Sequence, residues 1–176
     1  MLKIVLVPHK VLTSPTRPVK KIDEKIRRLV YDMEETLISQ VEPQGVGLAA
    51  TQIGLGLSLF IMKPSPKSET EVCINPKILK VESKPHHKDD MVEDKKLEGC
   101  LSIPRIWGPV SRARRVLLRY QDLTGATIEK WFTGFKATIV QHEMDHLSGI
   151  LFTQRSLEQK TPLYEEKDGE LEKMKY

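Results

Sequence analysis

Cysteine is scarce in this sequence, and its scarcity excludes the class of proteins that disulfide bonds hold together. The 176 residues include only Cys73 and Cys100, too few for the disulfide framework of a small secreted domain. A single domain of this length buries roughly two thirds of its unfolded surface, so it needs no such framework. We therefore expect a soluble protein from a reducing compartment, and we predict a cytoplasmic location.

Long apolar runs are absent as well. No stretch approaches the roughly 18 apolar residues that a membrane-spanning helix requires. Residues 1–8 also lack the small-residue cleavage pattern of a secretory signal peptide. The sequence therefore predicts no membrane association.

Charge of one sign is not gathered in one stretch. The net charge is +4, and the basic residues form short groups, such as Lys20-Lys21 and residues 112–115, rather than one stripe. Surfaces that bind nucleic acid usually concentrate Lys and Arg on one face. We therefore expect no direct nucleic-acid function.

Hydrophobic periodicity predicts an α+β fold. Apolar residues from Ile26 to Leu37 recur at helical spacing behind an N-capping Asp23. Short β-like runs lie at residues 57–62, 71–74 and 77–81, and a hairpin pattern covers residues 116–120 and 127–132. A second helix is predicted from near Thr133 to Gly149. We expect short, mainly antiparallel strands arranged around this second helix.

The second helix carries the motif HExxH, as His142, Glu143 and His146. On a helix, this spacing puts two imidazoles one turn apart on the same face, where they can chelate one metal ion. Glu143 then lies beside the ion without binding it. The motif therefore predicts a metal site on this helix.

Two imidazoles leave a divalent ion under-coordinated, because a catalytic site normally has three protein ligands and a water. Metzincin proteases take the third ligand from a histidine six residues after the second, but this chain has Phe152 there. Other zinc proteases use a downstream glutamate, for which Glu165, Glu166 or Glu170 are candidates. Cys100 is the better candidate, since it follows a glycine that lets the backbone approach closely.

Three segments carry further motifs at residues 45–52 (GVGLAATQ), 98–102 (EGCLS) and 141–147 (QHEMDHL). In this order they resemble the three motifs of the peptide deformylase family, and the resemblance extends over about the first 153 residues. It implies a catalytic domain at residues 1–153. Residues 154–176 form a charged tail, which we expect to be a marginal helix or disordered.

The resemblance implies both the activity and the metal ligands. Members of the family remove the formyl group from N-formylmethionyl nascent polypeptides and release formate. By resemblance, Cys100, His142 and His146 hold one divalent metal ion, with water in the fourth position. The implied ion is Fe2+ in the cell, although a thiolate and two imidazoles also suit Zn2+, Ni2+ or Co2+.

The resemblance also assigns catalytic roles to three further residues. Glu143 acts as the general base and then as the general acid. The side-chain amide of Gln52 and the backbone N–H of Leu101 donate to the oxyanion that forms on the substrate.

Peptide binding is predicted at the first motif. Gly45 and Gly47 flank Val46, an arrangement that lets an extended peptide lie against exposed backbone, as in strand addition. Val46 and Ile139 are predicted to line a pocket for the substrate methionine.

Other polar residues receive a supporting role or none. We expect Glu98 and Arg112 to form a buried pair that orients the loop of the cysteine ligand. We expect no metal binding by the remaining candidates, His9, Cys73, His86 and His87.

The expected partners are few, and two alternative functions stay open. We expect a monomer that acts on N-formylmethionyl peptides and contacts the ribosome at most transiently, because the tail has six acidic residues against five basic ones. One alternative is an HExxH metalloendopeptidase with a carboxylate third ligand. The other is a non-catalytic domain with a closed structural metal site.

Overall fold

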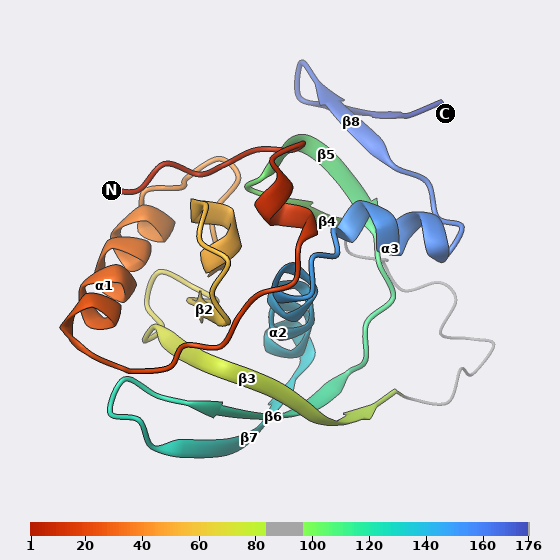
Figure 1. Ribbon diagram of the computed structural model, residues 1–176. Helices are drawn as coiled ribbons and strands as arrows, with labels where there is room; N and C mark the ends of the chain where they lie inside the picture. Colours follow the sequence, from red (N-terminus) through yellow and green to blue (C-terminus); the bar gives the residue numbers. More distant parts are fainter. Residues whose placement is uncertain (84–96, 176) are drawn as a thin grey trace.

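Two antiparallel β-sheets and three α-helices make up the computed structural model, which describes residues 1–83 and 97–175 (Figure 1). The five-stranded sheet has the order β1-β2-β3-β6-β7 and comprises β1 (Gly47–Ala49), β2 (Leu59–Met62), β3 (Glu71–Glu82), β6 (Arg115–Gln121) and β7 (Thr127–Thr133). The four-stranded sheet has the order β4-β5-β8-β9 and comprises β4 (Leu97–Cys100), β5 (Ile103–Pro109), β8 (Tyr164–Lys167) and β9 (Glu170–Lys173). The helices are α1 (Glu24–Ile38), α2 (Gly134–Leu147) and α3 (Phe152–Glu158), with short 3-10 helices η1 (Lys10–Thr13) and η2 (Ala50–Ile53). Neighbouring strands are antiparallel throughout, which confirms the predicted α+β class.

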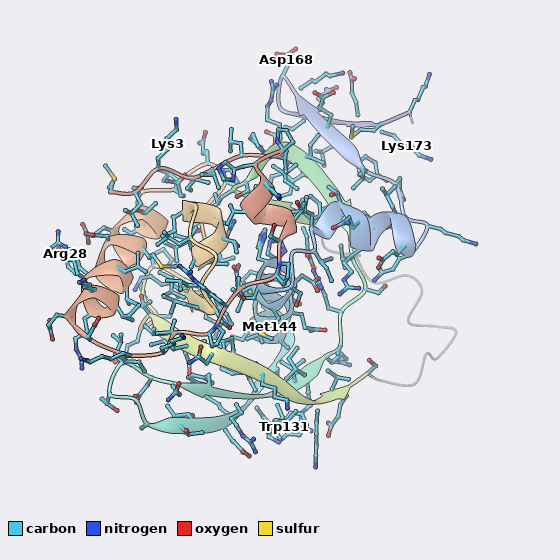
Figure 2. The ribbon with its side chains drawn as sticks, in the orientation of Figure 1. Lys3, Arg28, Trp131, Met144, Asp168 and Lys173 are labelled. Carbon is cyan, nitrogen blue, oxygen red and sulfur yellow. The ribbon has the colours of Figure 1, made fainter. Side chains whose placement is uncertain are left out.

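The five-stranded sheet packs against α1 on one face and against α2 on the other. Successive side chains of a strand point to opposite faces. In β2, Leu59 and Ile61 join the apolar cluster of α1, whereas Phe60 and Met62 join that of α2. Met144 of α2 is partly buried against this second cluster, whereas Arg28 of α1 lies at the periphery (Figure 2). The strand alternation therefore places α2, with its two histidines, in the interior.

Both predicted helices are confirmed. The carboxylate of Asp23 accepts the backbone N–H groups of Lys25 and Ile26 and so caps the first turn of α1. Gly149 follows α2 with a positive φ of 73°. A Cβ there would lie 2.7 Å from the backbone of Thr13, so the glycine lets the helix end pack against the N-terminal segment. Among the described residues, no helix has the length and apolar character needed to cross a bilayer.

β3 is one strand where the sequence predicts two, and that prediction is wrong. The predicted break, at residues 75–76, is a bulge, at which the pairing of β3 with β6 shifts register. Asn75 has a positive φ of 51°, and its side-chain amide exchanges two hydrogen bonds with the backbone of Val19 and donates one to Gln121. These bonds stabilise a backbone conformation that a regular ladder does not supply. The predicted hairpin is confirmed as β6 and β7.

The C-terminal segment also differs from its prediction. Instead of a marginal helix or a disordered tail, α3 begins at Phe152, and β8 and β9 form a hairpin that pairs with β5. The indole N–H of Trp107 donates to Glu166, 59 residues later in the chain, at 2.8 Å. A partner so distant leaves no periodic signal in the local sequence. The division of the chain at residue 153 stays a prediction.

The predicted polar loop at residues 82–96 falls almost entirely outside the described residues. Glu82 ends β3, and the description resumes with Leu97 at the start of β4. The expectations for His86 and His87 therefore lie outside the described residues.

Candidate metal centre

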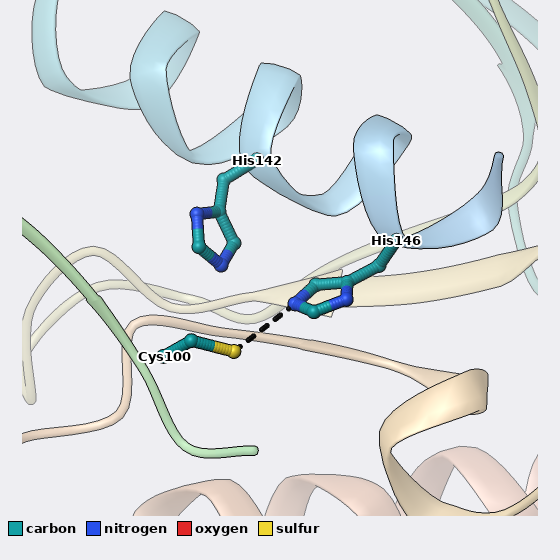
Figure 3. A group of neighbouring side chains, drawn as sticks. All are labelled: Cys100, His142 and His146. Atoms are coloured by element: carbon teal, nitrogen blue, oxygen red, sulfur yellow. Dashed lines mark hydrogen bonds between the residues drawn. The ribbon is translucent and has the colours of Figure 1, made fainter. Parts of the chain in front are cut away.

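α2 and the end of β4 bring one thiol and two imidazoles together (Figure 3). The Sγ of Cys100 lies 3.2 Å from Nε2 of His146. One ligand atom from each of Cys100, His142 and His146 lies within 4.8 Å of the others. A sulfur and two imidazole nitrogens at this separation fit a divalent transition-metal ion.

The thiol of Cys100 is poised to ionise. Burial by itself raises its pKa, but the charge of His146 and hydrogen bonds with both histidines outweigh burial and lower the pKa to about 5. The thiolate is the form that binds metal. Cys100 therefore offers a ligand that needs no strong base to deprotonate it.

Glu143 is buried beside the three candidate ligands, and one of its carboxylate oxygens makes no hydrogen bond within the described residues. Its Oε2 has no hydrogen-bond partner among the residues that the structure describes. Burial raises the pKa of its carboxyl group to about 7, although the neighbouring imidazoles act to lower it. A carboxyl group that titrates near neutral pH is suited to accepting a proton and returning it.

Gly47 of β1 makes room for this carboxylate. A Cβ on Gly47 would lie 2.3 Å from Oε1 of Glu143 and 3.0 Å from Cγ2 of Ile139. Real Cβ atoms do not approach other atoms this closely, so a larger residue would displace the carboxylate. Gly47 thus permits β1 to approach the Glu143 carboxylate of α2 closely.

Gln52 is held with its amide nitrogen toward the thiol. Its Oε1 accepts the backbone N–H of Ala49 at 2.8 Å, which directs Nε2 to Sγ of Cys100 at 3.4 Å. Leu101 follows Cys100 directly in the chain, and both residues line one cleft of about 830 Å³. The structure therefore brings both predicted oxyanion donors beside the predicted cysteine ligand.

Glu98 connects His142 to Arg112. One of its oxygens lies 3.0 Å from Nδ1 of His142, and Arg112 donates to both oxygens at 2.9 Å. The side chains of Glu98 and Arg112 are each only 8% exposed. Burial acts to raise the pKa of Glu98, but the hydrogen bonds from Arg112 and His142 lower it to about 2. The ionised carboxylate thus occupies one ring nitrogen of His142 and leaves the other for a metal ion.

Two members of this network escaped the sequence analysis. Arg112 also donates to Asp145 at 2.6 Å, and Arg155 of α3 donates to both oxygens of Asp145 at 2.7 and 3.1 Å. The position of Asp145 inside the HExxH motif could have indicated that its side chain lies near the metal site. No local pattern indicates Arg155, because a helix end and a turn separate it from α2.

A cleft of about 830 Å³ opens beside the ligands, and the predicted peptide-binding residues Gly45, Val46, Gly47 and Ile139 line it. Within the described residues, β1 and β4 are edge strands of their sheets, and both border the cleft. The stripe of α2 that faces the cleft comprises Phe135, Thr138, Ile139, His142 and Glu143. Phe135 and Thr138 were not predicted, although their helical spacing from His142 would have indicated them.

The glutamates considered as alternative third ligands lie in the second sheet. Glu166 accepts from Trp107, and Glu165 forms an ion pair with Lys167 at 3.1 Å. Glu170 lies on β9. In the part of the chain that the structure describes, the one group of ligand atoms close enough to share an ion is that of Cys100 and the two HExxH histidines. Among residues 1–83 and 97–175, neither a carboxylate ligand nor a fourth protein ligand joins this group.

Comparisons with known proteins identify relatives along nearly the whole chain. The family model described as "Polypeptide deformylase" matches residues 1–162. A peptide deformylase of Aquifex aeolicus is 38% identical over 156 residues, which cover 86% of this chain and 85% of that protein. One of Dictyoglomus turgidum is 38% identical over 95% of this chain and 99% of its own.

Solved structures agree with the relatives found by sequence. The crystal structure of peptide deformylase from Thermotoga maritima is 33% identical, with a TM-score of 0.76 over 88% of this chain and 97% of that one. The peptide deformylase from Synechococcus elongatus, solved in complex with actinonin, is 33% identical, with a TM-score of 0.77 over 88% and 78% of the two chains.

Removal of Arg112 tests the buried network. In Arg112→Ala, Glu98 and Asp145 lose their shared cation, and breaking such a buried pair typically lowers the free energy of unfolding by about 3 to 5 kcal/mol. We expect a loss of that order in urea unfolding and a metal affinity reduced roughly 10- to 100-fold. Arg112→Lys should be intermediate, because lysine cannot form the two-pronged contact. Unchanged stability and metal affinity in Arg112→Ala would contradict the orienting role.

Proposed function

The chain belongs to the polypeptide deformylase family, and from this premise we propose that Cys100, His142 and His146 hold the metal ion on which its activity depends. The protein is a metal-dependent hydrolase that removes the N-formyl group from N-formylmethionyl polypeptides and releases formate. The single observation that supports the proposed ligands is the convergence of one thiol and two imidazoles at the wall of a cleft, beside a buried carboxylate.

The ligand set suits several ions, and we propose Fe2+ as the one bound in the cell. A thiolate with two imidazoles accepts Fe2+, Zn2+, Ni2+ or Co2+ on ligand softness. When bound, such an ion supplies a Lewis acid that polarises the formyl carbonyl and acidifies water in contact with it. Glu98 would support the site by holding Nδ1 of His142.

Glu143 is the proposed general base and acid. Its Oε2, which has no partner within residues 1–83 and 97–175, and its raised pKa support a role in which it takes a proton from the attacking water and returns it to the leaving amine. Negative charge grows on the former carbonyl oxygen during the attack. The side-chain amide of Gln52 and the backbone N–H of Leu101 would donate hydrogen bonds to that oxygen. The bond from Ala49 supports this assignment for Gln52, because it turns the amide nitrogen toward the site.

The substrate peptide is proposed to lie between the two sheets. β1 and β4 border the cleft as edge strands, so their backbone groups are placed to pair with an extended chain by strand addition. Val46 and Ile139 would contact the methionine side chain, with Phe135 and Thr138 continuing the wall along α2.

We also propose a location, an oligomeric state and a ribosome contact for this protein. We expect a cytoplasmic monomer whose substrates are nascent chains and whose contact with the ribosome is transient. The acidic balance of residues 154–176 supports a weak contact, since ribosomal RNA repels acidic segments. Residues 1–153 would form the catalytic domain, although α3 crosses that boundary.

A pair of matched peptides tests the function. Protein loaded anaerobically with Fe2+, or with Ni2+, should release formate from a formyl-Met peptide but no acetate from its acetylated twin. We expect this difference because the reaction of the family removes a formyl group and releases formate. Protein stripped of metal by a chelator serves as the control. Cleavage of internal peptide bonds without formate release would contradict the proposal.

The roles of Glu143 and Cys100 are separable. Glu143→Gln should retain its metal but lose roughly 100- to 10,000-fold in kcat, the usual contribution of acid and base catalysis. Cys100→Ala should lose metal, as read by metal analysis after dialysis. Near-normal turnover by Glu143→Gln would refute the base assignment.

Gly47 offers a test that removes no functional group and changes only the position of Glu143. Gly47→Ala should bind metal normally but lose roughly 100-fold in kcat/KM, because displacement of a catalytic group by about 1 Å costs that much. Gly56→Ala is the matched control, since a Cβ at Gly56 would meet no atom of the described residues within 4 Å. Equal activities of the two variants would show that Gly47 does not set the position of Glu143.

A further inference from the structure

We propose that Arg155 of α3 is a positioning residue for the metal site, acting on His142 through Asp145, Arg112 and Glu98. This inference rests on the proposed function, because it takes His142 to be a metal ligand. It extends that proposal to a residue outside all three motifs and beyond the predicted catalytic domain.

A continuous chain of charged hydrogen bonds joins Arg155 to the ligand. Arg155 donates from Nη2 to Oδ1 of Asp145 at 2.7 Å and from Nε to Oδ2 at 3.1 Å. Asp145 accepts from Arg112 at 2.6 Å, and Arg112 donates twice to Glu98 at 2.9 Å. Glu98 then contacts Nδ1 of His142 at 3.0 Å. Each link is a hydrogen bond of 2.6 to 3.1 Å to a carboxylate, so a displacement at one end is transmitted by direct contact.

Arg155 balances the charge of the buried network. The two carboxylates of Glu98 and Asp145 face two guanidinium groups, those of Arg112 and Arg155. Without Arg155, two buried carboxylates would share one cation. Asp145 would then compete with Glu98 for Arg112, and the hold of Glu98 on the His142 ring would loosen.

The same helix supports His142 by a second contact. The ring of Phe152, the first residue of α3, is stacked on that of His142 with centroids 6.2 Å apart and planes at 24°. Phe152 is fully buried, so it fixes α3 close to the ligand. α3 therefore reaches His142 both through the ring of Phe152 and through the charges that begin at Arg155.

Partial burial distinguishes this contact from a surface ion pair. The Arg155 side chain is 33% exposed and that of Asp145 11%, whereas the Arg119–Glu129 pair has both side chains about half exposed. Exposed pairs usually contribute little. Arg119 is therefore a suitable control for the loss of an arginine as such.

Metal affinity is the decisive measurement. For Arg155→Met we expect the dissociation constant for Co2+, measured by competition with a chelator below the melting temperature, to rise about tenfold. Arg155→Lys should recover part of the loss, because it restores the charge without the two-pronged geometry. Arg119→Met should bind Co2+ like the unsubstituted protein. So should Glu158→Gln, which removes only the other ion pair of Arg155.

A double-substitution cycle keeps the test independent of stability. If Arg155 acts through Asp145, Arg155→Met should have little further effect on Co2+ affinity in an Asp145→Asn background. The Co2+ absorption spectrum of Arg155→Met should also change, since the His142 ring is less well held. Unchanged affinity and spectrum in Arg155→Met would overturn the inference, as would full additivity with Asp145→Asn.

Cys100→Ala separates the two proposals. Loss of Co2+ binding in that variant, together with normal binding in Arg155→Met, would refute the role of Arg155 and leave the proposed ligands intact. Normal Co2+ binding in Cys100→Ala would refute the ligand set itself, and the inference about Arg155 with it.

Discussion

The buried contact between Arg112 and Glu98 is the constraint on which the rest of the site depends. It places a carboxylate, held ionised, against one ring nitrogen of His142, and it links β4 to the segment before β6 and to α2. Buried ion pairs do little for stability compared with apolar packing of the same volume. Their value here is geometric, because the pair fixes the ring of a ligand in one orientation.

Secondary structure supplies the frame within which this pair can form. Alternation along β2 sends Phe60 and Met62 to α2, which draws a helix with two histidines and a glutamate into the interior. Gly47 then sets how closely β1 approaches Glu143. The same close approach leaves an edge strand at the border of the cleft, so the element that positions the carboxylate is also placed to receive the peptide.

The parts that could be predicted from the sequence are those with short-range signals. Asp23 and the repeat behind it indicate α1, and the HExxH spacing indicates two imidazoles on one helical face. β3 was misread because Pro76 separates its two apolar runs, whereas distant partners at Val19 and Gln121 stabilise the neighbouring Asn75 as a bulge. The β8–β9 hairpin and Arg155 were missed because the groups that hold them lie in β5 and α2.

By itself, the sequence determined α1, α2, the β6–β7 hairpin, the candidate ligands and the resemblance of three motifs to one family, since these depend on residue type and local spacing. Only the tertiary structure decided how close Cys100 lies to the two histidines, which oxygen of Glu143 is unpartnered, and that α3 reaches His142 through four charged side chains. Those features depend on packing between segments far apart in the chain, where burial and hydrogen-bond geometry, rather than periodicity, fix the position of each group.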